Sequence, residues 1–392
     1  MERKGSGAVD VVVIGAGAVG LAISRRLAGT GRSVAVLDRE VRGASASRSA
    51  AGMLAPRGEA REPGPFFDLA LASRRAFGAF AAELVEESGI ELDYREDGLV
   101  GLGRDAEEES ELARRAEWQR AAGFVVEELT RAEAAARWPE LAFPAAPPPG
   151  ESRRFAEGRL FFFPDEAQVD AEPLVDALLA SCRARGVELG LGREARGLRI
   201  ESGRVRAVRT AEGEVACELV VNAAGAWAGA VAGWTGEVLP VGPVRGELLA
   251  YATAFRAPRP VVAAGNAYAL LRRGGRLLVG ATVERAGFEA RVTREGQAWL
   301  EAEAAALVPG LSGVPPAARW AGLRPGTPDD LPVIGFSPEI GGFYHAAGHF
   351  RNGILLAPAT AELALAEIEA GTNADASAFS PERFAAAEGR PR

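Results

Sequence analysis

The residues Gly15-Ala16-Gly17-Ala18-Val19-Gly20 fit the pattern G-x-G-x-x-G, and Asp38 follows about 20 residues later. In this pattern the first glycine permits a tight turn, the second lets the backbone approach a pyrophosphate, and the third lets a helix pack on a strand. The unpaired N–H groups at the helix N-terminus attract the pyrophosphate. A carboxylate at Asp38 suits ribose hydroxyls and repels a 2′-phosphate. These residues predict a dinucleotide site and leave FAD and NAD open.

The neighbouring sequence supplies the elements that such a site needs. Val9 to Ile14 is a β-branched run typical of a buried parallel strand. The pattern is helical from Val19 to Leu27, and we expect left-handed geometry at Gly29 and Gly31 to end the helix. Ser33 to Leu37 is a second apolar run that Asp38 closes. Together these segments predict one βαβ unit around the glycines.

Three other stretches of small residues follow apolar runs and could approach a flat ligand closely. Residues 42–55 are rich in Ser, Ala and Gly, and we expect Ala51-Gly52-Met53 to form a wall of the site. The strand 219–222 ends in Ala223-Ala224-Gly225. Gly348 to Gly353 repeats the order of strand, glycine-flanked turn and helix N-terminus, which favours negative charge on a bound group.

The remaining periodicity predicts an α/β protein with an inserted sheet. Helices are expected at 66–88, 107–123, 171–185 (with Asp170 as cap) and 293–306, and an amphipathic helix at 354–369. Strands are expected at 159–163, 187–191, 198–200, 204–210, 214–217 and 343–347, and an antiparallel sheet from 241 to 282. Arg324 is expected between a strand and a Pro-Gly turn, and the Pro-rich residues 144–150 are expected to form a linker.

Composition excludes several classes of function. The net charge of −8, with no basic block, argues against nucleic acid as a partner. Lys4 is the only lysine and His345 and His349 are the only histidines, so Schiff-base chemistry and a His-rich metal site are not expected. Cys182 and Cys217 are two unclustered cysteines, which fits a reducing cytoplasm. We expect no signal peptide and no transmembrane segment, because no apolar run is long enough.

Three long motifs, together with the nucleotide pattern, carry a family resemblance. They are SAAGML (Ser49 to Leu54), WAGLRPGTPD (Trp320 to Asp329) and AAGHFRNGILLAPAT (Ala346 to Thr360). With them the chain resembles the flavin-dependent amine and amino-acid oxidases that include D-amino-acid oxidase, and among these the glycine oxidases of thiamine thiazole synthesis. The resemblance runs from about residue 9 to about residue 370.

The resemblance implies a Rossmann-like FAD-binding domain with an inserted mixed or antiparallel β-sheet domain for the substrate. We expect residues 1–88, 151–240 and 319–392 in the first domain and residues 89–150 and 241–318 in the second. It also implies non-covalent FAD, since no cysteine follows Cys217. The implied cofactor residues are Gly15, Gly17, Ala18, Val19, Gly20, Asp38, Arg39, Ala46, Ser47, Ala51, Gly52, Met53, Ala195, Ala224, Gly225, His349, Phe350, Arg351, Asn352, Gly353, Ile354 and Leu355.

On the substrate side the resemblance implies that Arg324 binds the carboxylate of a small amino acid, with Tyr268 and Arg351 beside it. A guanidinium binds a planar carboxylate through two charge-assisted bonds. No catalytic side chain is expected: few histidines and one remote lysine leave hydride transfer from Cα of the neutral amine to the flavin. O₂ then reoxidises the flavin and gives hydrogen peroxide. The family further suggests a homotetramer.

Two positions depart from the family pattern. Val283 stands where these oxidases often have methionine, and Asn266 where they often have histidine; both are expected to line the substrate pocket. The substrate therefore stays open among glycine, sarcosine, D-alanine and D-proline. Two other functions also stay open: a D-amino-acid or imino-acid dehydrogenase that passes electrons to a quinone, and a flavin-binding protein that assists tRNA modification or structure without oxidising amines.

Overall fold

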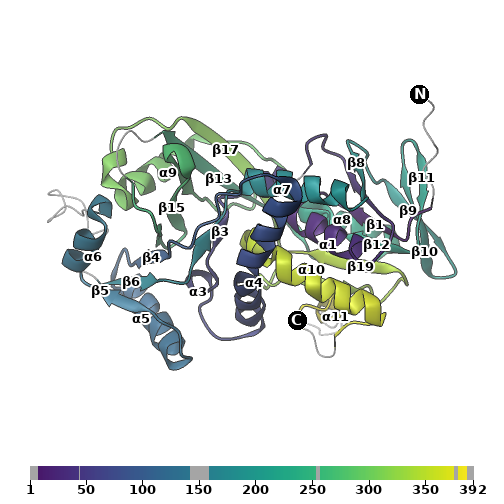
Figure 1. Cartoon of the computed structure of the whole chain (residues 1–392), viewed down its shortest axis with the longest axis horizontal. Coiled ribbons are helices and arrows are strands. Elements are labelled where there is room, and N and C mark those ends of the chain that lie inside the picture. The colour runs from purple at the N-terminus through teal and green to yellow at the C-terminus, as the bar shows by residue number, and fades with distance from the viewer. Residues whose placement is uncertain (1–7, 44, 142–158, 253–256, 375–377, 386–392) are drawn as a thin grey trace.

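A computed structural model describes residues 8–43, 45–141, 159–252, 257–374 and 378–385. The linker expected at 144–150 lies outside these residues. Two large sheets organise the chain and lie toward opposite ends of its long axis, as Figure 1 shows. Among the described helices, none is both long and apolar enough to cross a membrane.

The first sheet has six strands in the order β18-β19-β12-β1-β2-β8. All neighbours pair in parallel except β18 and β19, which are antiparallel. In that order the strands are Val333–Phe336, Phe343–Ala347, Leu219–Asn222, Val11–Ile14, Val34–Asp38 and Glu188–Leu191.

The two faces of this sheet bury alternate residues of β1, as strand geometry requires. Val11 and Val13 pack into a core with helices α1 (Ala18–Ala28), α4 (Pro65–Ser88), α7 (Ala171–Ala184) and α10 (Gly353–Ala370). Val12 and Ile14 pack against a three-stranded antiparallel sheet of β9 (Gly197–Glu201), β10 (Arg204–Thr210) and β11 (Gly213–Ala216). The meander expected after residue 197 is therefore confirmed, and it covers one face of the parallel sheet.

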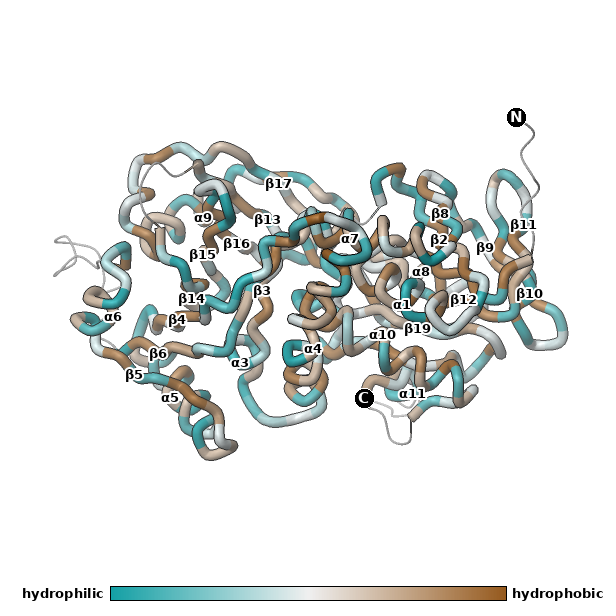
Figure 2. The backbone as a smooth tube through the Cα atoms, in the orientation of Figure 1, coloured by the Kyte–Doolittle hydropathy of each residue, from teal (hydrophilic) through white to brown (hydrophobic). Residues whose placement is uncertain are grey.

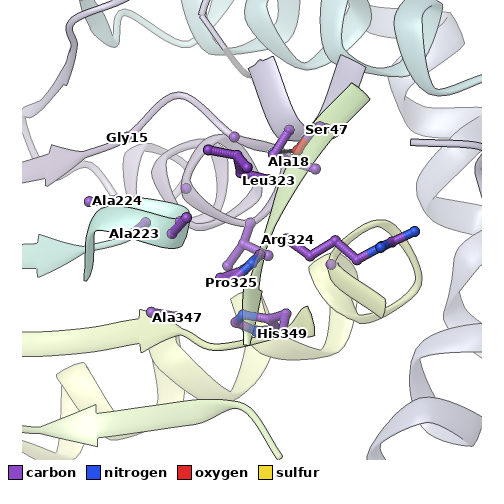
Figure 3. A pocket seen from close by; sticks show the side chains of 18 of the residues that line it. Gly15, Ala18, Ser47, Ala223, Ala224, Leu323, Arg324, Pro325, Ala347 and His349 are labelled. Carbon is purple, nitrogen blue, oxygen red and sulfur yellow. Dashed lines mark hydrogen bonds between the residues drawn. The ribbon is translucent and has the colours of Figure 1, made fainter. Parts of the chain in front are cut away.

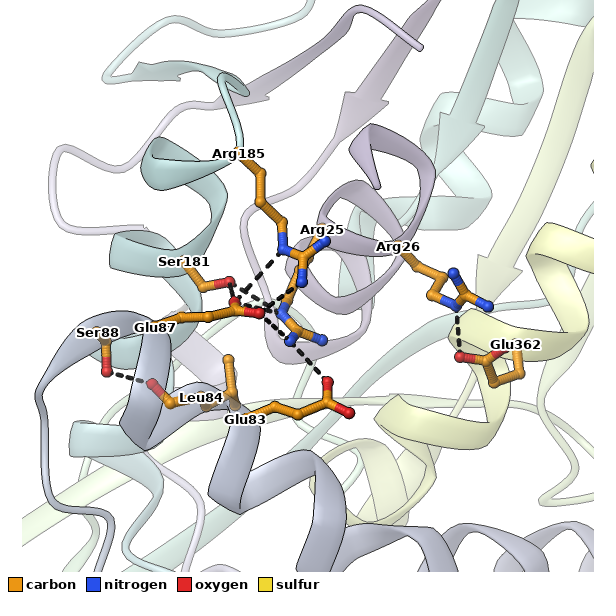
Figure 4. A network of polar contacts seen from close by, with 9 residues as sticks. All are labelled: Arg25, Arg26, Glu83, Leu84, Glu87, Ser88, Ser181, Arg185 and Glu362. Carbon is orange, nitrogen blue, oxygen red and sulfur yellow. Dashed lines mark hydrogen bonds and ion pairs between the residues drawn. The ribbon is translucent and has the colours of Figure 1, made fainter. Parts of the chain in front are cut away.

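A buried polar network ties three of these helices together. Arg25 of α1 is 5% exposed, and its guanidinium lies 2.8 Å from Glu83 and 2.7 Å from Glu87, both on α4. Its Nε also donates to Ser181 Oγ of α7 at 2.9 Å. Figure 4 shows the cluster, with the separate surface pair of Arg26 and Glu362 at its side.

The second sheet has eight strands in the order β17-β13-β16-β15-β14-β4-β6-β5. All neighbours are antiparallel except β14 and β4. In that order they are Ala318–Gly326, Gly242–Ala252, Arg276–Gly280, Ala267–Leu271, Val261–Ala264, Leu99–Leu102, Leu160–Phe163 and Glu127–Leu129. Helix α9 (Arg294–Leu307) covers one face with apolar residues, and these strands carry hydrophobic segments in Figure 2. The expected insertion is thus a mixed sheet.

The smaller elements complete the chain. Strands β3 (Met53–Leu54) and β7 (Ala167–Gln168) form a two-stranded ladder. The remaining helices are α2 (Ser45–Arg48), α3 (Pro56–Glu59), α5 (Ala106–Ala121), α6 (Arg131–Arg137), α8 (Ala228–Ala232) and α11 (Glu382–Ala385). Short 3₁₀ turns lie at 139–141, 225–227, 233–235, 273–275, 309–311 and 350–352.

Four local expectations differ from the structure. Helix α1 ends at Gly29 in right-handed geometry, and only Gly31 has a positive φ, +87°. Arg324 lies inside β17, because Pro325 pairs with Pro243 of β13 and the strand continues to Gly326. Helix α10 is buried on most sides, since α1 and α4 both pack against it. The ladders place β6 and β17 in the eight-stranded sheet, whereas the expected boundaries put residues 160–163 and 319–326 with the nucleotide-binding part.

Candidate functional site

A cavity of about 320 Å³ lies between the two sheets, a size typical of small-molecule sites. Figure 3 shows how its walls converge: Gly15 and Ala18 from the β1–α1 turn, Ala223 and Ala224 after β12, Leu323 to Pro325 on β17, and His349 after β19. In the six-stranded sheet this position is the carboxyl edge of the parallel strands, where open α/β sheets bind ligands.

Nearly all the residues predicted for the site line this cavity. On the cofactor side they are Gly15, Gly17, Ala18, Val19, Gly20, Asp38, Arg39, Ala46, Ser47, Ala51, Gly52, Met53, Ala195, Ala224, Gly225, His349, Phe350, Arg351, Asn352, Gly353 and Ile354; on the substrate side they are Tyr268, Arg324 and, again, Arg351. Leu355 is the exception: its side chain is fully buried in the helical core instead. Val283 and Asn266, both expected in the pocket, are not among the lining residues.

The glycine turn is held from two sides. Gly15 has φ +110°, and a Cβ there would lie 2.2 Å from the carbonyl oxygen of Ala223, so only glycine fits. Asp38 Oδ2 accepts a hydrogen bond from the Ala16 N–H at 2.7 Å, and Ser47 Oγ accepts one from the Ala18 N–H at 3.0 Å. Asp38 thus positions the turn itself, and its ribose role stays a prediction.

Hydrogen bonds from buried groups hold the wall at Ala51-Gly52-Met53 in place. Arg272, at the end of β15, is 2% exposed and donates hydrogen bonds to the Ala51 carbonyl and to Gln168 Oε1. The Val169 N–H donates to the Gly52 carbonyl at 2.9 Å. Burial lowers the pKa of Arg272 to about 10, so the guanidinium still carries its positive charge behind this wall. No motif in the sequence indicates this role of Arg272.

The turn after β12 is also held from behind. Asn222 Nδ2 donates to the Ala228 carbonyl at 2.9 Å and lies 3.2 Å from His345 Nδ1. His345 Nε2 lies 3.0 Å from Glu237 Oε2. Burial acts to raise the pKa of Glu237, but the hydrogen bond and charge of His345, together with a hydrogen bond from Ser337, outweigh it, so the pKa lies below its usual value. This chain of contacts fixes the small residues that line the cavity, and no motif in the sequence indicated it.

Arg39 and Trp227 meet at the edge of the cavity. The Arg39 guanidinium lies 3.7 Å from the centre of the Trp227 ring, a cation–π contact. Trp227 in turn stacks on Phe288, with ring centres 5.1 Å apart. The ends of β2 and β12 are therefore bridged across the mouth of the site.

The substrate-side residues come together from three elements. Arg324 of β17 donates to the carbonyls of Thr282 at 2.9 Å and Arg245 at 3.4 Å. Its guanidinium lies over Gly246 of β13, where a Cβ would come within 2.2 Å of Nη1. Tyr268 of β15 is 8% exposed, and burial raises the pKa of its hydroxyl, so the phenol stays protonated near neutral pH. Burial lowers the pKa of Arg324.

Arg351, in the turn before α10, has a carboxylate partner that the sequence analysis did not identify. Its Nη2 lies 3.3 Å from Glu59 Oε1, and its Nη1 donates to Asn266 Oδ1 at 3.3 Å. Glu59 ends the short helix α3, in the sequence PRGE, and also lines the cavity. Such a segment looks like ordinary surface, so only the fold reveals that the carboxylate enters the site.

His349 contributes a neutral imidazole. It is 3% exposed, its Nε2 lies 3.0 Å from Thr360 Oγ1, and burial lowers the pKa of the imidazole to about 3. It therefore cannot act as a cationic group near neutral pH. On its substrate side the lining thus combines the guanidiniums of Arg324 and Arg351, the phenol of Tyr268 and the carboxylate of Glu59, which is paired with Arg351. This arrangement suits an anionic ligand beside a dinucleotide.

Comparison with known proteins agrees with this geometry. The family model "FAD dependent oxidoreductase" matches residues 10–367. A glycine oxidase of Geobacillus kaustophilus is 37% identical over 357 residues, which are 90% of either chain. A crystal structure of glycine oxidase from that organism superposes with a TM-score of 0.87 at 35% identity, covering 96% of this chain and 98% of that one.

A third relative is a longer protein. The "Bifunctional protein ThiO/ThiG" of Synechocystis is 34% identical over 383 residues, which are 96% of this chain and 54% of that one. The match of the family model and the identity to these relatives extend over most of the chain, including every wall of the cavity. The chain therefore belongs to the family of FAD-dependent oxidoreductases.

Proposed function

We propose that the protein is an FAD-dependent glycine oxidase that converts glycine, sarcosine and small D-amino acids to the imine or 2-oxo acid, with release of hydrogen peroxide and of ammonia, or of methylamine where sarcosine is the substrate. The single observation that carries this proposal is the Arg324 guanidinium, which lines the cavity and has only carbonyl oxygens and the Tyr268 hydroxyl as described partners. A cation in that setting calls for a carboxylate, such as that of an amino acid.

We propose that FAD binds non-covalently along the cofactor-side residues given above, with the pyrophosphate at the β1–α1 turn. Both cysteines support the absence of a covalent link, because Cys182 and Cys217 are buried in the core and burial raises the pKa of each thiol to about 12. When bound, FAD supplies the acceptor for a hydride from Cα and passes the electrons to O₂.

The chain's own residues contribute binding and orientation. Arg324 and Tyr268, which both line the cavity, would hold the carboxylate and so orient the substrate. Orientation of this kind contributes to rate without a catalytic base. His349 is neutral near neutral pH, which agrees with a hydride transfer in which no imidazolium takes part.

The wider setting is part of the same proposal. The likeness to the two-activity protein of Synechocystis supports a role in making the thiazole of thiamine. The two free cysteines favour the cytoplasm, and the family suggests a homotetramer. Light scattering tests the last point, because a tetramer has four times the mass of the chain.

The test is peroxide release by the purified yellow protein in air with glycine, sarcosine, D-alanine and D-proline. Methylamine is the matched control, since it is glycine without the carboxylate that Arg324 would hold. We expect peroxide with glycine and sarcosine and none with methylamine. Bleaching of the flavin and turnover with dye acceptors, without peroxide, would identify a dehydrogenase; absence of bleaching with all four amino acids would contradict the proposal.

A further inference from the structure

The two guanidiniums on the substrate side of the cavity, those of Arg324 and Arg351, differ in their partners. Arg351 lies 3.3 Å from the Glu59 carboxylate, and both side chains are mostly shielded from water, at 19% and 16% exposure. Within the described residues, no carboxylate oxygen lies within 4.0 Å of the Arg324 guanidinium, whose acceptors are the carbonyls of Thr282 and Arg245. One cation is thus neutralised inside the protein and the other is left for a ligand.

The influences on the pKa values of the two arginines also differ. The Glu59 carboxylate raises the pKa of Arg351 more than any other group affects it. For Arg324, burial is the largest influence and lowers the pKa; the charge of Arg351 adds to that effect, whereas Tyr268 and the more weakly acting Glu59 oppose it. A ligand carboxylate therefore gains most beside Arg324, whereas near Arg351 it meets the negative charge of Glu59 at short range.

Glu59 is held in this place by the rest of its helix. The adjacent Arg57 is 1% exposed, and its N–H and Nε donate to Glu166 Oε1 at 2.9 and 3.2 Å. Gln119 Nε2 donates to the Arg57 carbonyl at 2.9 Å. These buried contacts fix α3 against α5 and the turn between β6 and β7, so the carboxylate at its end cannot easily withdraw from the cavity.

We propose that Glu59 determines substrate specificity by restricting the site to amino acids with a single carboxylate. The inference rests on the proposed function and deepens it. A second carboxylate, such as the one on the nitrogen substituent of iminodiacetate, would reach toward Arg351 and be repelled by Glu59. Without the Glu59 charge, Arg351 becomes a second anchor and the site accepts dicarboxylates.

The experiment compares wild type with Glu59→Gln, which keeps the shape and removes the charge. Glu62→Gln is the matched control, since Glu62 is exposed on the same segment and is not among the residues that line the cavity. We expect the ratio of kcat/KM for iminodiacetate to that for glycine to rise at least tenfold in Glu59→Gln and to stay within twofold in Glu62→Gln.

A binding readout separates specificity from catalysis. Acetate and malonate are unreactive ligands whose dissociation constants can be measured from the flavin spectrum of the holoenzyme. We expect malonate to bind at least tenfold more tightly to Glu59→Gln than to wild type, with acetate changed less than threefold.

A second variant guards against a folding defect in the first. Asn266→Asp places another carboxylate beside Arg351 from an exposed position. We expect this variant to bind malonate more weakly than wild type does, and to have a lower ratio of kcat/KM for iminodiacetate to that for glycine. If glycine is oxidised normally but neither variant changes the ratio or malonate binding, the inference about Glu59 is wrong. If wild type does not oxidise glycine, the proposed function fails, and the malonate titrations still decide the role of Glu59.

Discussion

The role of each shielded arginine at the cavity depends on the partner that the fold gives its guanidinium. Arg324, Arg351 and Arg272 are all shielded guanidiniums, yet Arg324 is bonded to carbonyls, Arg351 is paired with a carboxylate, and Arg272 holds a backbone wall. A buried cation without a counter-ion is costly unless a ligand supplies one. This difference supports the proposal that the ligand carboxylate binds Arg324.

Replacement of Arg324 tests that assignment. Arg324→Met should raise KM for glycine by about 10- to 100-fold, because charge-assisted hydrogen bonds contribute about 1.5–3 kcal/mol. Gly246→Ala should act in the same direction while it keeps the arginine, because the added Cβ would displace the guanidinium. Steady-state kinetics gives KM, and the absorbance of bound flavin shows that the cofactor is retained. An unchanged KM in both variants would refute the carboxylate role.

His349 makes a second prediction at this scale. The pKa of its imidazole is about 3 in the folded protein and near 6.5 in the unfolded chain, so the unfolded state binds more protons between these values. The contribution of this group to stability is therefore complete above pH 6.5 and is lost as the pH falls toward 3, by about 1.4 kcal/mol per pH unit. Urea unfolding at pH 7.5 and 5.5 should show this loss in wild type but not in His349→Gln. Parallel pH dependences would contradict it.

Sequence reasoning reached the residues that lie in recognisable patterns. The glycine turn, Asp38, Tyr268, Arg324 and Arg351 all lie at the cavity, because motif spacing or family resemblance locates them. Glu59, Arg272 and Asn222 have no such signal. Their roles arise from contacts across long stretches of chain, such as Arg351 with Glu59 and Arg272 with Ala51, which local patterns do not encode.

At the scale of elements, burial and strand pairing explain which helices and strands could be predicted from the sequence and which could not. The first βαβ unit and the meander at 197–216 were predictable, since their apolar periods and turn glycines agree with their local structure. Arg324 was expected near a turn because Pro-Gly is normally a turn signal, but long pairing with β13 keeps β17 extended through both residues. Helix α10 was expected to be amphipathic, and its burial by α1 and α4 depends on packing between distant segments.

The helices behind the parallel sheet give a prediction at this scale. Burial acts to raise the pKa of Glu87, but hydrogen bonds from Arg25, Arg185 and Ser181 hold it at about 2. Arg25→Met removes the buried guanidinium but leaves Glu87 its contacts with Arg185 and Ser181, so it should lower the free energy of unfolding by about 1.5–3 kcal/mol.

Arg26→Met is the control in the next residue of the same helix. Its pair with Glu362 is 41% and 61% exposed, so the expected loss is at most about 1 kcal/mol. Urea unfolding monitored by circular dichroism measures both losses. Equal losses in the two variants would show that the buried network does not tie α1, α4 and α7 together.

At the scale of the whole molecule, the cavity is where the two sheets meet. The six-stranded sheet supplies the glycine turn and the turns after β12 and β19, and the eight-stranded sheet supplies Tyr268, Leu248 and the Arg324 strand. A cofactor bound there would contact both sheets, so its binding would also stabilise the packing of the six-stranded sheet against the eight-stranded sheet. The mixed pairing that builds the second sheet joins segments far apart in the chain, which is why the boundaries expected from sequence divided it.

Removal of FAD should therefore loosen the segment that lies between the sheets. We expect apoprotein to be cut by trypsin after Arg42 and Arg48, which flank cavity residues Ala46 and Ser47, several times faster than holoprotein. Cuts after Arg114 and Arg120 on α5, away from the cavity, should proceed at the same rate in both forms. Peptide masses after timed digestion give the rates, and added FAD should restore protection, with about 2.7 kcal/mol of stabilisation at a hundredfold excess over its dissociation constant. If FAD protected all four sites equally, the cofactor would stabilise the protein as one cooperative unit and not through the junction of the sheets.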